Sequence, residues 1–122
     1  MYILIVDSDE SIRKALKIGL TRSGWIIDDA PAAMVCSTDL INQHQYNVII
    51  IDFDIEETCV LDIIRQKKQQ NHKLIIVSMT RKSISDFFSD DDANFVNACY
   101  QKPLHLNMLK KAIDLELKKL DL

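Results

Sequence analysis

Four residues whose side chains suit phosphoryl or metal chemistry each follow an apolar run: Asp7, Asp52, Ser78 and Lys102. The runs span residues 2–6, 48–51, 74–77 and, more weakly, 95–100. In an open parallel sheet, the carboxyl ends of the strands form the crevice in which ligands bind. Two acids, a hydroxyl and an ammonium group that meet there can hold a divalent cation and handle a phosphoryl group. These four residues are therefore the main functional signal of the chain.

Each of the four has a role in this chemistry. Asp52 is the candidate nucleophile, because a carboxylate oxygen can form an acyl phosphate. Asp7 would help to hold Mg²⁺, a hard cation that takes oxygen ligands and keeps several waters. Lys102 and the Ser78 hydroxyl would contact the phosphoryl oxygens. A lone strand-end aspartate is as often a helix cap, and Lys102 could equally form a purely structural ion pair with Asp52.

The elements that must position these residues alternate between apolar runs and helical patterns. Strand-like runs begin near residues 2, 25, 47, 74 and 95. The intervals are wide enough for a helix-containing crossover between parallel strands. Continuous apolar strands such as 48–51 are typical of a sheet covered on both faces. The sequence therefore predicts a doubly wound α/β fold, with a five-stranded parallel sheet and five helices in three layers; the second helix is entered through Pro31.

Composition limits the class of protein. The 122 residues fit one domain, 1–122, and the net charge of −3 gives no electrostatic basis for nucleic-acid binding. We find no run of about 20 apolar residues that could span a membrane, and the N-terminal run lacks the basic lead of a signal peptide. Cys36, Cys59 and Cys99 are odd in number and have no CxxC spacing, so we expect reduced thiols, two of them in core packing. These features predict a soluble, cytoplasmic protein.

The four segments together resemble the receiver domain of two-component response regulators. The resemblance rests on the runs ending in Asp7, Asp52 and Ser78 and on the pair Lys102-Pro103, and it covers essentially the whole chain. It implies a flavodoxin-like strand order 2-1-3-4-5 and a phosphoryl group accepted on Asp52 from a sensor histidine kinase or phosphotransfer protein. It also implies an output surface near the fourth and fifth helices. Such a domain is a regulator rather than an enzyme, and a homodimer is one state that the family allows.

The sequence departs from the family pattern around the metal site. Receivers usually carry two adjacent acids after the first strand, whereas this chain has Asp7 followed by Ser8. Asp54 could supply a compensating carboxylate, so the predicted metal ligands are Asp7, Asp52 and Asp54. The loop after Asp52 contains neither Pro nor Gly and adds Glu56 and Glu57. Because this negative charge repels a phosphodonor unless a cation is bound, we predict Mg²⁺-dependent chemistry.

Two other functions fit parts of the sequence. A degenerate receiver could act as a phosphorylation-independent interaction module, which Ser8 and the unusual loop favour. A haloacid-dehalogenase-like phosphohydrolase is suggested by Asp52-Phe53-Asp54, which resembles its nucleophile and acid pair. That family needs a further acidic metal motif after its lysine strand, and it begins its fold at the nucleophile strand. The phosphohydrolase is therefore the weaker alternative.

Overall fold

Five parallel strands form one sheet in the computed structural model, which describes residues 1–21, 24–55, 57–88, 94–102 and 105–120. The strands are β1 (Tyr2–Val6), β2 (Ile26–Ala30), β3 (Val48–Asp52), β4 (Ile75–Thr80) and β5 (Ala98–Gln101). Their order is β2-β1-β3-β4-β5, and every pair is parallel. The predicted fold class and strand order are confirmed.

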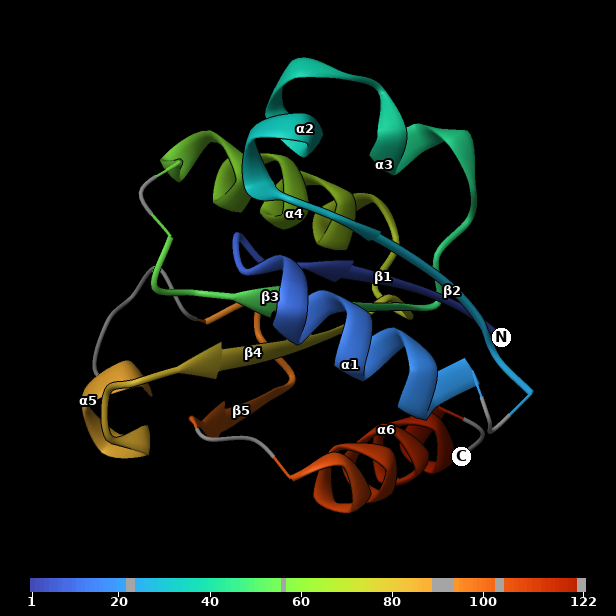
Figure 1. Ribbon diagram of the computed structural model, residues 1–122, viewed down its shortest axis with the longest axis vertical. Coiled ribbons are helices and arrows are strands. Elements are labelled where there is room, and N and C mark those ends of the chain that lie inside the picture. The colour runs from blue at the N-terminus through green and yellow to red at the C-terminus, as the bar shows by residue number, and fades with distance from the viewer. Residues whose placement is uncertain (22–23, 56, 89–93, 103–104, 121–122) are drawn as a thin grey trace.

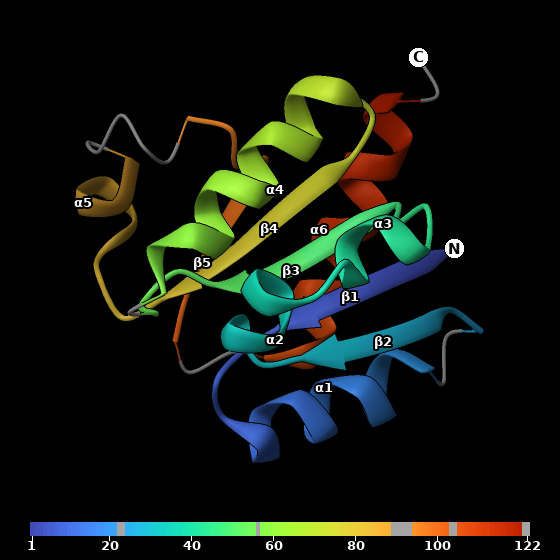
Figure 2. The same cartoon turned by 90° about the horizontal axis from the view of Figure 1, so that it is seen from above.

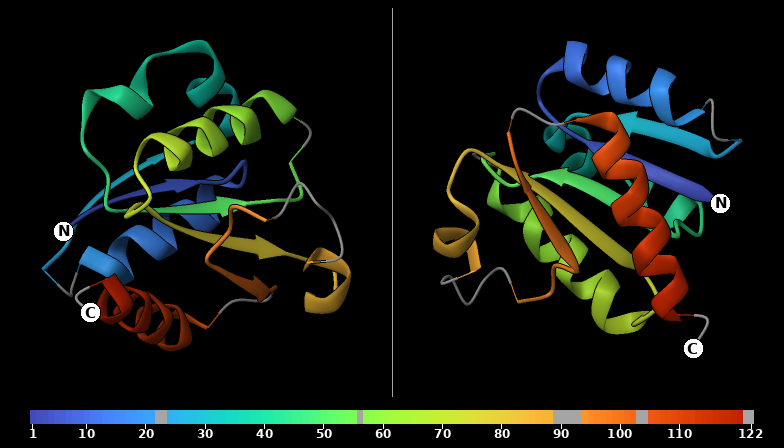
Figure 3. Two further views of the ribbon diagram at one scale, coloured as in Figure 1. Left: turned by 180° about the vertical axis from the view of Figure 1, so that it is seen from behind. Right: turned by 90° about the horizontal axis from the view of Figure 1, so that it is seen from below.

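Helices cover both faces of the sheet. Helices α1 (Glu10–Thr21) and α6 (Leu106–Leu120) lie side by side on one face, as Figure 3 shows. Helices α2 (Ala32–Ser37), α3 (Leu40–Gln43) and α4 (Thr58–Gln70) lie on the other, while α5 (Ile84–Phe88) sits beyond the end of β4 (Figure 1). No helix of the described residues is long and apolar enough to cross a membrane.

Two hydrophobic cores fill the space between the sheet and its helix layers. Because successive strand residues point to opposite faces, Leu4 and Val6 of β1 join the core under α2 and α4, whereas Ile3 and Ile5 join the core under α1 and α6. Strands β3 and β4 are buried at every position, which explains their continuous apolar sequences. Figure 2 shows α4 running over β3 and β4. The sheet is thus held firmly on both faces below the strand ends that carry the candidate site.

The described residues contain six helices instead of the predicted five. The second predicted helix is interrupted at Thr38, whose backbone is extended (φ −129°, ψ 173°). The Thr38 hydroxyl donates a 2.6 Å hydrogen bond to the Met34 carbonyl, and its N–H donates to the same oxygen. Threonine side chains compete in this way with regular helical bonding, so α2 ends there and α3 begins after Asp39.

The prediction that all cysteines are reduced thiols is wrong for two of them. Cys36 on α2 and Cys59 on α4 form a disulfide, with a Cα–Cα distance of 6.1 Å. They are 23 residues apart in sequence, and only the packing of α2 against α4 brings them together. Cys99 is the free cysteine.

Candidate functional site

Asp52 and Lys102 form an ion pair at the carboxyl end of the sheet. Asp52 is the last residue of β3, and Lys102 directly follows β5. Lys102 Nζ lies 3.0 Å from Asp52 Oδ1, and the two side chains are only 16% and 10% exposed. The Lys102 N–H donates a hydrogen bond to the Thr80 carbonyl, which fixes the backbone from which the lysine reaches across β4. Asp52 and Lys102, which are 50 residues apart in sequence, therefore meet at the carboxyl ends of the strands, as the sequence predicts.

Asp7 is buried beside this pair. It directly follows β1 and is 1% exposed. Its Oδ1 accepts a 2.8 Å hydrogen bond from the Asp9 N–H, whereas Oδ2 has no hydrogen-bond partner among the described residues. Burial raises the pKa of the Asp7 carboxyl, and the negative charge of Asp52 raises it further, while the Asp9 N–H and Lys102 oppose the shift. Asp7 is thus a buried carboxyl group with one oxygen that has no partner among the described residues and could bind a cation.

Ser8 and Asp9 do not add acidic groups to the site. Ser8 is exposed, and Asp9 caps helix α1: its Oδ1 accepts hydrogen bonds from the N–H (2.9 Å) and hydroxyl (2.6 Å) of Ser11. These bonds lower the pKa of Asp9, with the Ser11 hydroxyl contributing most. The carboxylate that follows Ser8 is therefore used to start α1.

Ser78 lies inside β4, because the strand continues for two residues beyond it to Thr80. Its side chain is fully buried, and Oγ has no hydrogen-bond partner among the described residues. In the sheet, Ser78 is in register with Ile51 on one side and Cys99 on the other. This buried hydroxyl, in register with Cys99 and one register position before Asp52, is a donor available to a group bound at the strand ends.

Both carboxylate oxygens of Asp54 accept hydrogen bonds, one from the last residue of β4 and one from the loop that follows it. Oδ1 accepts a 2.8 Å hydrogen bond from the Thr80 hydroxyl, and Oδ2 accepts a 2.7 Å bond from the Arg81 N–H. The Asp54 N–H in turn donates to Asp52 Oδ1 at 2.9 Å. The backbone of Asp54 therefore serves the acceptor carboxylate, while its side chain joins the acceptor loop to the β4–α5 loop.

The sequence reasoning missed Thr80 and Arg13. Thr80 lies two residues after Ser78, so strand periodicity places both hydroxyls on the same side of the sheet. Arg13 on α1 donates a 2.7 Å hydrogen bond to the Asp7 carbonyl and a 3.0 Å bond to Asp29 on β2. Arg13 thereby ties the backbone of Asp7 to a neighbouring strand, a contact for which the sequence holds no local signal.

Of the three predicted magnesium ligands, Asp7 and Asp52 fit the ion, whereas the side chain of Asp54 is engaged in other hydrogen bonds. Asp7 and Asp52 supply two carboxylates, and Oδ2 of Asp7 is buried without a partner, which is the chemistry that a hard cation satisfies. Within the described ranges, no group of three His, Cys, Asp or Glu side chains could hold a metal. Mg²⁺ is commonly bound by one or two protein carboxylates and completes its coordination with water. Asp7 and Asp52 could therefore hold the ion without a third carboxylate.

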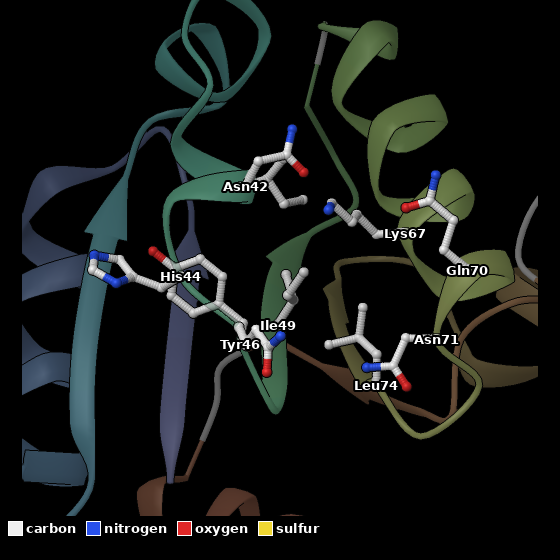
Figure 4. A pocket seen from close by; sticks show the side chains of 10 residues that line it. Asn42, His44, Tyr46, Ile49, Lys67, Gln70, Asn71 and Leu74 are labelled. Carbon is white, nitrogen blue, oxygen red and sulfur yellow. The ribbon is translucent and has the colours of Figure 1, made fainter.

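A cavity of about 410 Å³ lies elsewhere in the molecule. It is flanked by Asn42 of α3 and Lys67 of α4, and Ile49, Tyr46 and Leu74 form part of its wall (Figure 4). Leu74 precedes β4 and Tyr46 precedes β3, so this cavity is at the amino ends of the strands. The cavity and Asp52 therefore lie at opposite ends of the strands.

Comparison with known proteins identifies relatives of the whole fold. The family model described as the response regulator receiver domain matches residues 3–114. The sensor protein EvgS of Escherichia coli strain K12 is 28% identical over 110 residues, which are 90% of this chain. The same match covers 9% of EvgS, so the chain spans about a tenth of the length of that curated relative.

Solved structures share the same architecture. A two-component response regulator from Clostridium difficile superposes with a TM-score of 0.82 at 21% identity, over 100% of this chain and 99% of that chain. The response regulator protein TrrA from Thermotoga maritima gives a TM-score of 0.77 at 22% identity, over 95% of this chain and 98% of that one. TrrA was solved in complex with Mg²⁺–BeF and, separately, with the histidine kinase ThkA.

Proposed function

We propose that this chain, which belongs to the response regulator receiver domain family, accepts a phosphoryl group on Asp52 and transmits the change to a surface formed by α5 and α6. The observation that carries the proposal is the convergence of Asp52, Asp7 and Lys102 at the carboxyl end of the sheet, with the 3.0 Å contact between Lys102 and Asp52. We further propose that residues 1–122 act as one receiver domain.

The acceptor carboxylate is held in an orientation suited to attack. Within the described residues, the Asp54 N–H and Lys102 Nζ both contact Oδ1 of Asp52. Oδ2 is thus the oxygen that can bond to phosphorus while the bond between phosphorus and the donor breaks. Lys102 and the buried Ser78 hydroxyl then offer positive charge and a hydrogen bond to the transferred group. Movement of Ser78 toward the phosphoryl oxygen would displace β4 and the loop before α5.

Magnesium is the proposed cofactor. Asp7 and Asp52 would hold it, and when bound it would neutralise negative charge on the entering phosphoryl group. Asp54 contributes to this set through its side chain only if its bonds to Thr80 and Arg81 open. The presence of Mg²⁺–BeF in the TrrA structure supports this assignment by analogy.

The proposed partner is a histidine kinase or a phosphotransfer protein that donates the phosphoryl group. The kinase complex of TrrA and the match to part of a sensor protein support this choice. The chain would then be a regulator whose only chemistry is its own phosphorylation and dephosphorylation. We place it in the cytoplasm, where kinases obtain their nucleoside triphosphate.

The test is the intact mass of the protein after incubation with a small acyl-phosphate donor. We expect a gain of one phosphoryl group that requires Mg²⁺ and is lost in Asp52→Asn. Asp62→Asn, which changes a solvent-exposed aspartate on α4, is the matched control and should still gain the group. Phosphate retained by Asp52→Asn would remove Asp52 from its assigned role.

A second candidate is a phosphorylation-independent interaction module. It is favoured by the engaged side chain of Asp54 and by exposed Ser8 at the position where receivers usually have a second acid. No gain of mass at high donor and high Mg²⁺ would favour this module over the phosphoacceptor.

A further inference from the structure

The disulfide between Cys36 and Cys59 joins two helices beside the acceptor loop. Cys36 is the penultimate residue of α2, and Cys59 is the second residue of α4. Cys59 is exposed and Cys36 is half-buried against the core under α2 and α4. The bond therefore lies near the surface, and Cys59 is the more exposed of the two residues.

The start of α4 has no side-chain cap among the described residues. Glu57 precedes the helix but makes no side-chain capping hydrogen bond, and the first turn contains no acidic residue that would favour the helix N-terminus. The first buried side chain of the helix is Val60. The disulfide is consequently the covalent tie that fixes this turn to α2.

The same turn ends the loop that begins at the acceptor. At the strand end of this loop, the Phe53 N–H donates to the Met79 carbonyl at 2.9 Å, and the Asp54 N–H donates to Asp52 Oδ1 at 2.9 Å. The other end of the loop is held by α4. The position of α4 therefore influences how firmly the Asp54 N–H is presented to the acceptor carboxylate.

We propose that Cys36–Cys59 is a thiol–disulfide exchange site whose oxidation state controls the acceptor loop, the reactants being small thiols or protein dithiols. The rate effect on Asp52 rests on the proposed phosphoacceptor function. In a reducing cytoplasm, protein disulfides are mostly transient or redox-sensing, which favours a reversible bond here over a permanent staple. Burial raises the pKa of the third thiol, Cys99, which leaves it less reactive than an exposed cysteine.

The exchange balances with two thiols. A thiolate attacks Sγ of Cys59, the protein S–S bond breaks, and Cys36 leaves as a thiolate that takes a proton. A second thiolate attacks the incoming sulfur of this mixed disulfide and releases Cys59, which is also protonated. The protein gains two electrons and two protons, and the two reactant thiols become one disulfide. The reverse reaction closes the bridge.

The test compares the oxidised and reduced wild-type chain with Cys36→Ser/Cys59→Ser. Each form is alkylated and weighed to establish the state of the bridge, then phosphorylated with a small acyl-phosphate donor and Mg²⁺. We expect the oxidised form to be phosphorylated at least about fivefold faster than the reduced form. A fivefold effect is at the low end of the coupling usually found between two sites of one protein. The double variant should react at the rate of the reduced wild type in both buffers. Equal rates for the two wild-type forms, or a bridge that never closes in the oxidising buffer, would overturn the proposal.

Amide hydrogen exchange gives a readout that does not require phosphorylation. Reduction should speed exchange at residues 53–55 and in the first turn of α4 by about fivefold or more, with β1 unchanged. If neither form takes phosphate, the phosphoacceptor function fails, and the exchange rates alone decide the control of the loop. Equal exchange in the two states would then refute it.

Discussion

Replacing Asp7 with asparagine should stabilise the metal-free protein at neutral pH. Asp7 is 1% exposed, its Oδ2 has no hydrogen-bond partner among the described residues, and burial raises its pKa. Asparagine keeps the oxygen that accepts the Asp9 N–H and replaces the carboxyl group with a neutral amide. An unsatisfied buried polar group costs about 1–3 kcal/mol, so we expect the free energy of unfolding to rise by about 2 kcal/mol.

Urea unfolding at pH 7 with a chelator measures this change. With a denaturant slope of about 2 kcal/mol per molar, the midpoint should rise by about 1 M. Asp114→Asn is the matched control, because Asp114 is exposed on α6, and it should change stability by less than about 0.5 kcal/mol. A midpoint for Asp7→Asn that is equal to or below that of the wild type would refute the view that the buried Asp7 side chain destabilises the metal-free protein.

The pH dependence supplies an independent check on the same residue. Since the pKa of Asp7 is raised in the folded protein above its ordinary value of 3.8, the folded state holds its proton to higher pH than the unfolded state. The stability penalty of Asp7 is full above the folded pKa and disappears as the pH falls through that pKa toward 3.8. The advantage of Asp7→Asn should therefore shrink on acidification. If the stability advantage of Asp7→Asn instead grew at low pH, the assignment of a raised pKa to Asp7 in the folded protein would be wrong.

Three further changes test neighbouring parts of the structure. Lys102→Ala should lower the free energy of unfolding in urea by about 2 kcal/mol, because it leaves the buried Asp52 carboxylate without its partner. In an Asp52→Asn background the loss should be smaller, because no carboxylate is then left unpaired. Ser8→Asp should tighten Mg²⁺ binding about tenfold, measured by calorimetry, because an added attraction of about 1.4 kcal/mol corresponds to that factor. An unchanged affinity would show that residue 8 lies outside the metal site. Gly19→Ala places a Cβ against the Leu106 side chain, which must shift, so the gain in helix propensity of about 1 kcal/mol should appear in full only in a Leu106→Ala background.

The three central strands β1, β3 and β4 could be predicted because they are buried on both faces. The apolar runs at residues 3–6, 48–51 and 74–77 coincide with strands or their immediate starts, and Asp7, Asp52 and Lys102 follow from the strand ends. The strand order required the family resemblance, since the runs themselves do not say which neighbour each strand takes. At Gly19 of α1, an added Cβ would meet the Leu106 side chain of α6, a helix–helix contact for which the sequence holds no local signal.

The contacts that escaped prediction depend on tertiary packing. Asp54 meets Thr80 across 26 residues, and its carboxylate was expected near the metal because the sequence shows no competing partner. The disulfide depends on the packing of α2 against α4, which brings together two cysteines 23 residues apart. Neither contact leaves a periodic or spacing signal in the chain.

The charge of the site explains why Ser8 has two opposing effects. Asp7 and Asp52 are buried with one lysine, and Lys102 contacts Asp52, so one negative charge is left without an ion-pair partner within the described residues. Burial raises the pKa of Asp7, and the negative charge of Asp52 raises it further. A second acid at position 8 would add to this repulsion, so serine leaves the resting site less strained. It also removes a cation ligand, and a phosphoryl group brings more negative charge to the same oxygens. Under the proposed function, phosphorylation of this chain should therefore depend more steeply on Mg²⁺ concentration than in a receiver with two adjacent acids.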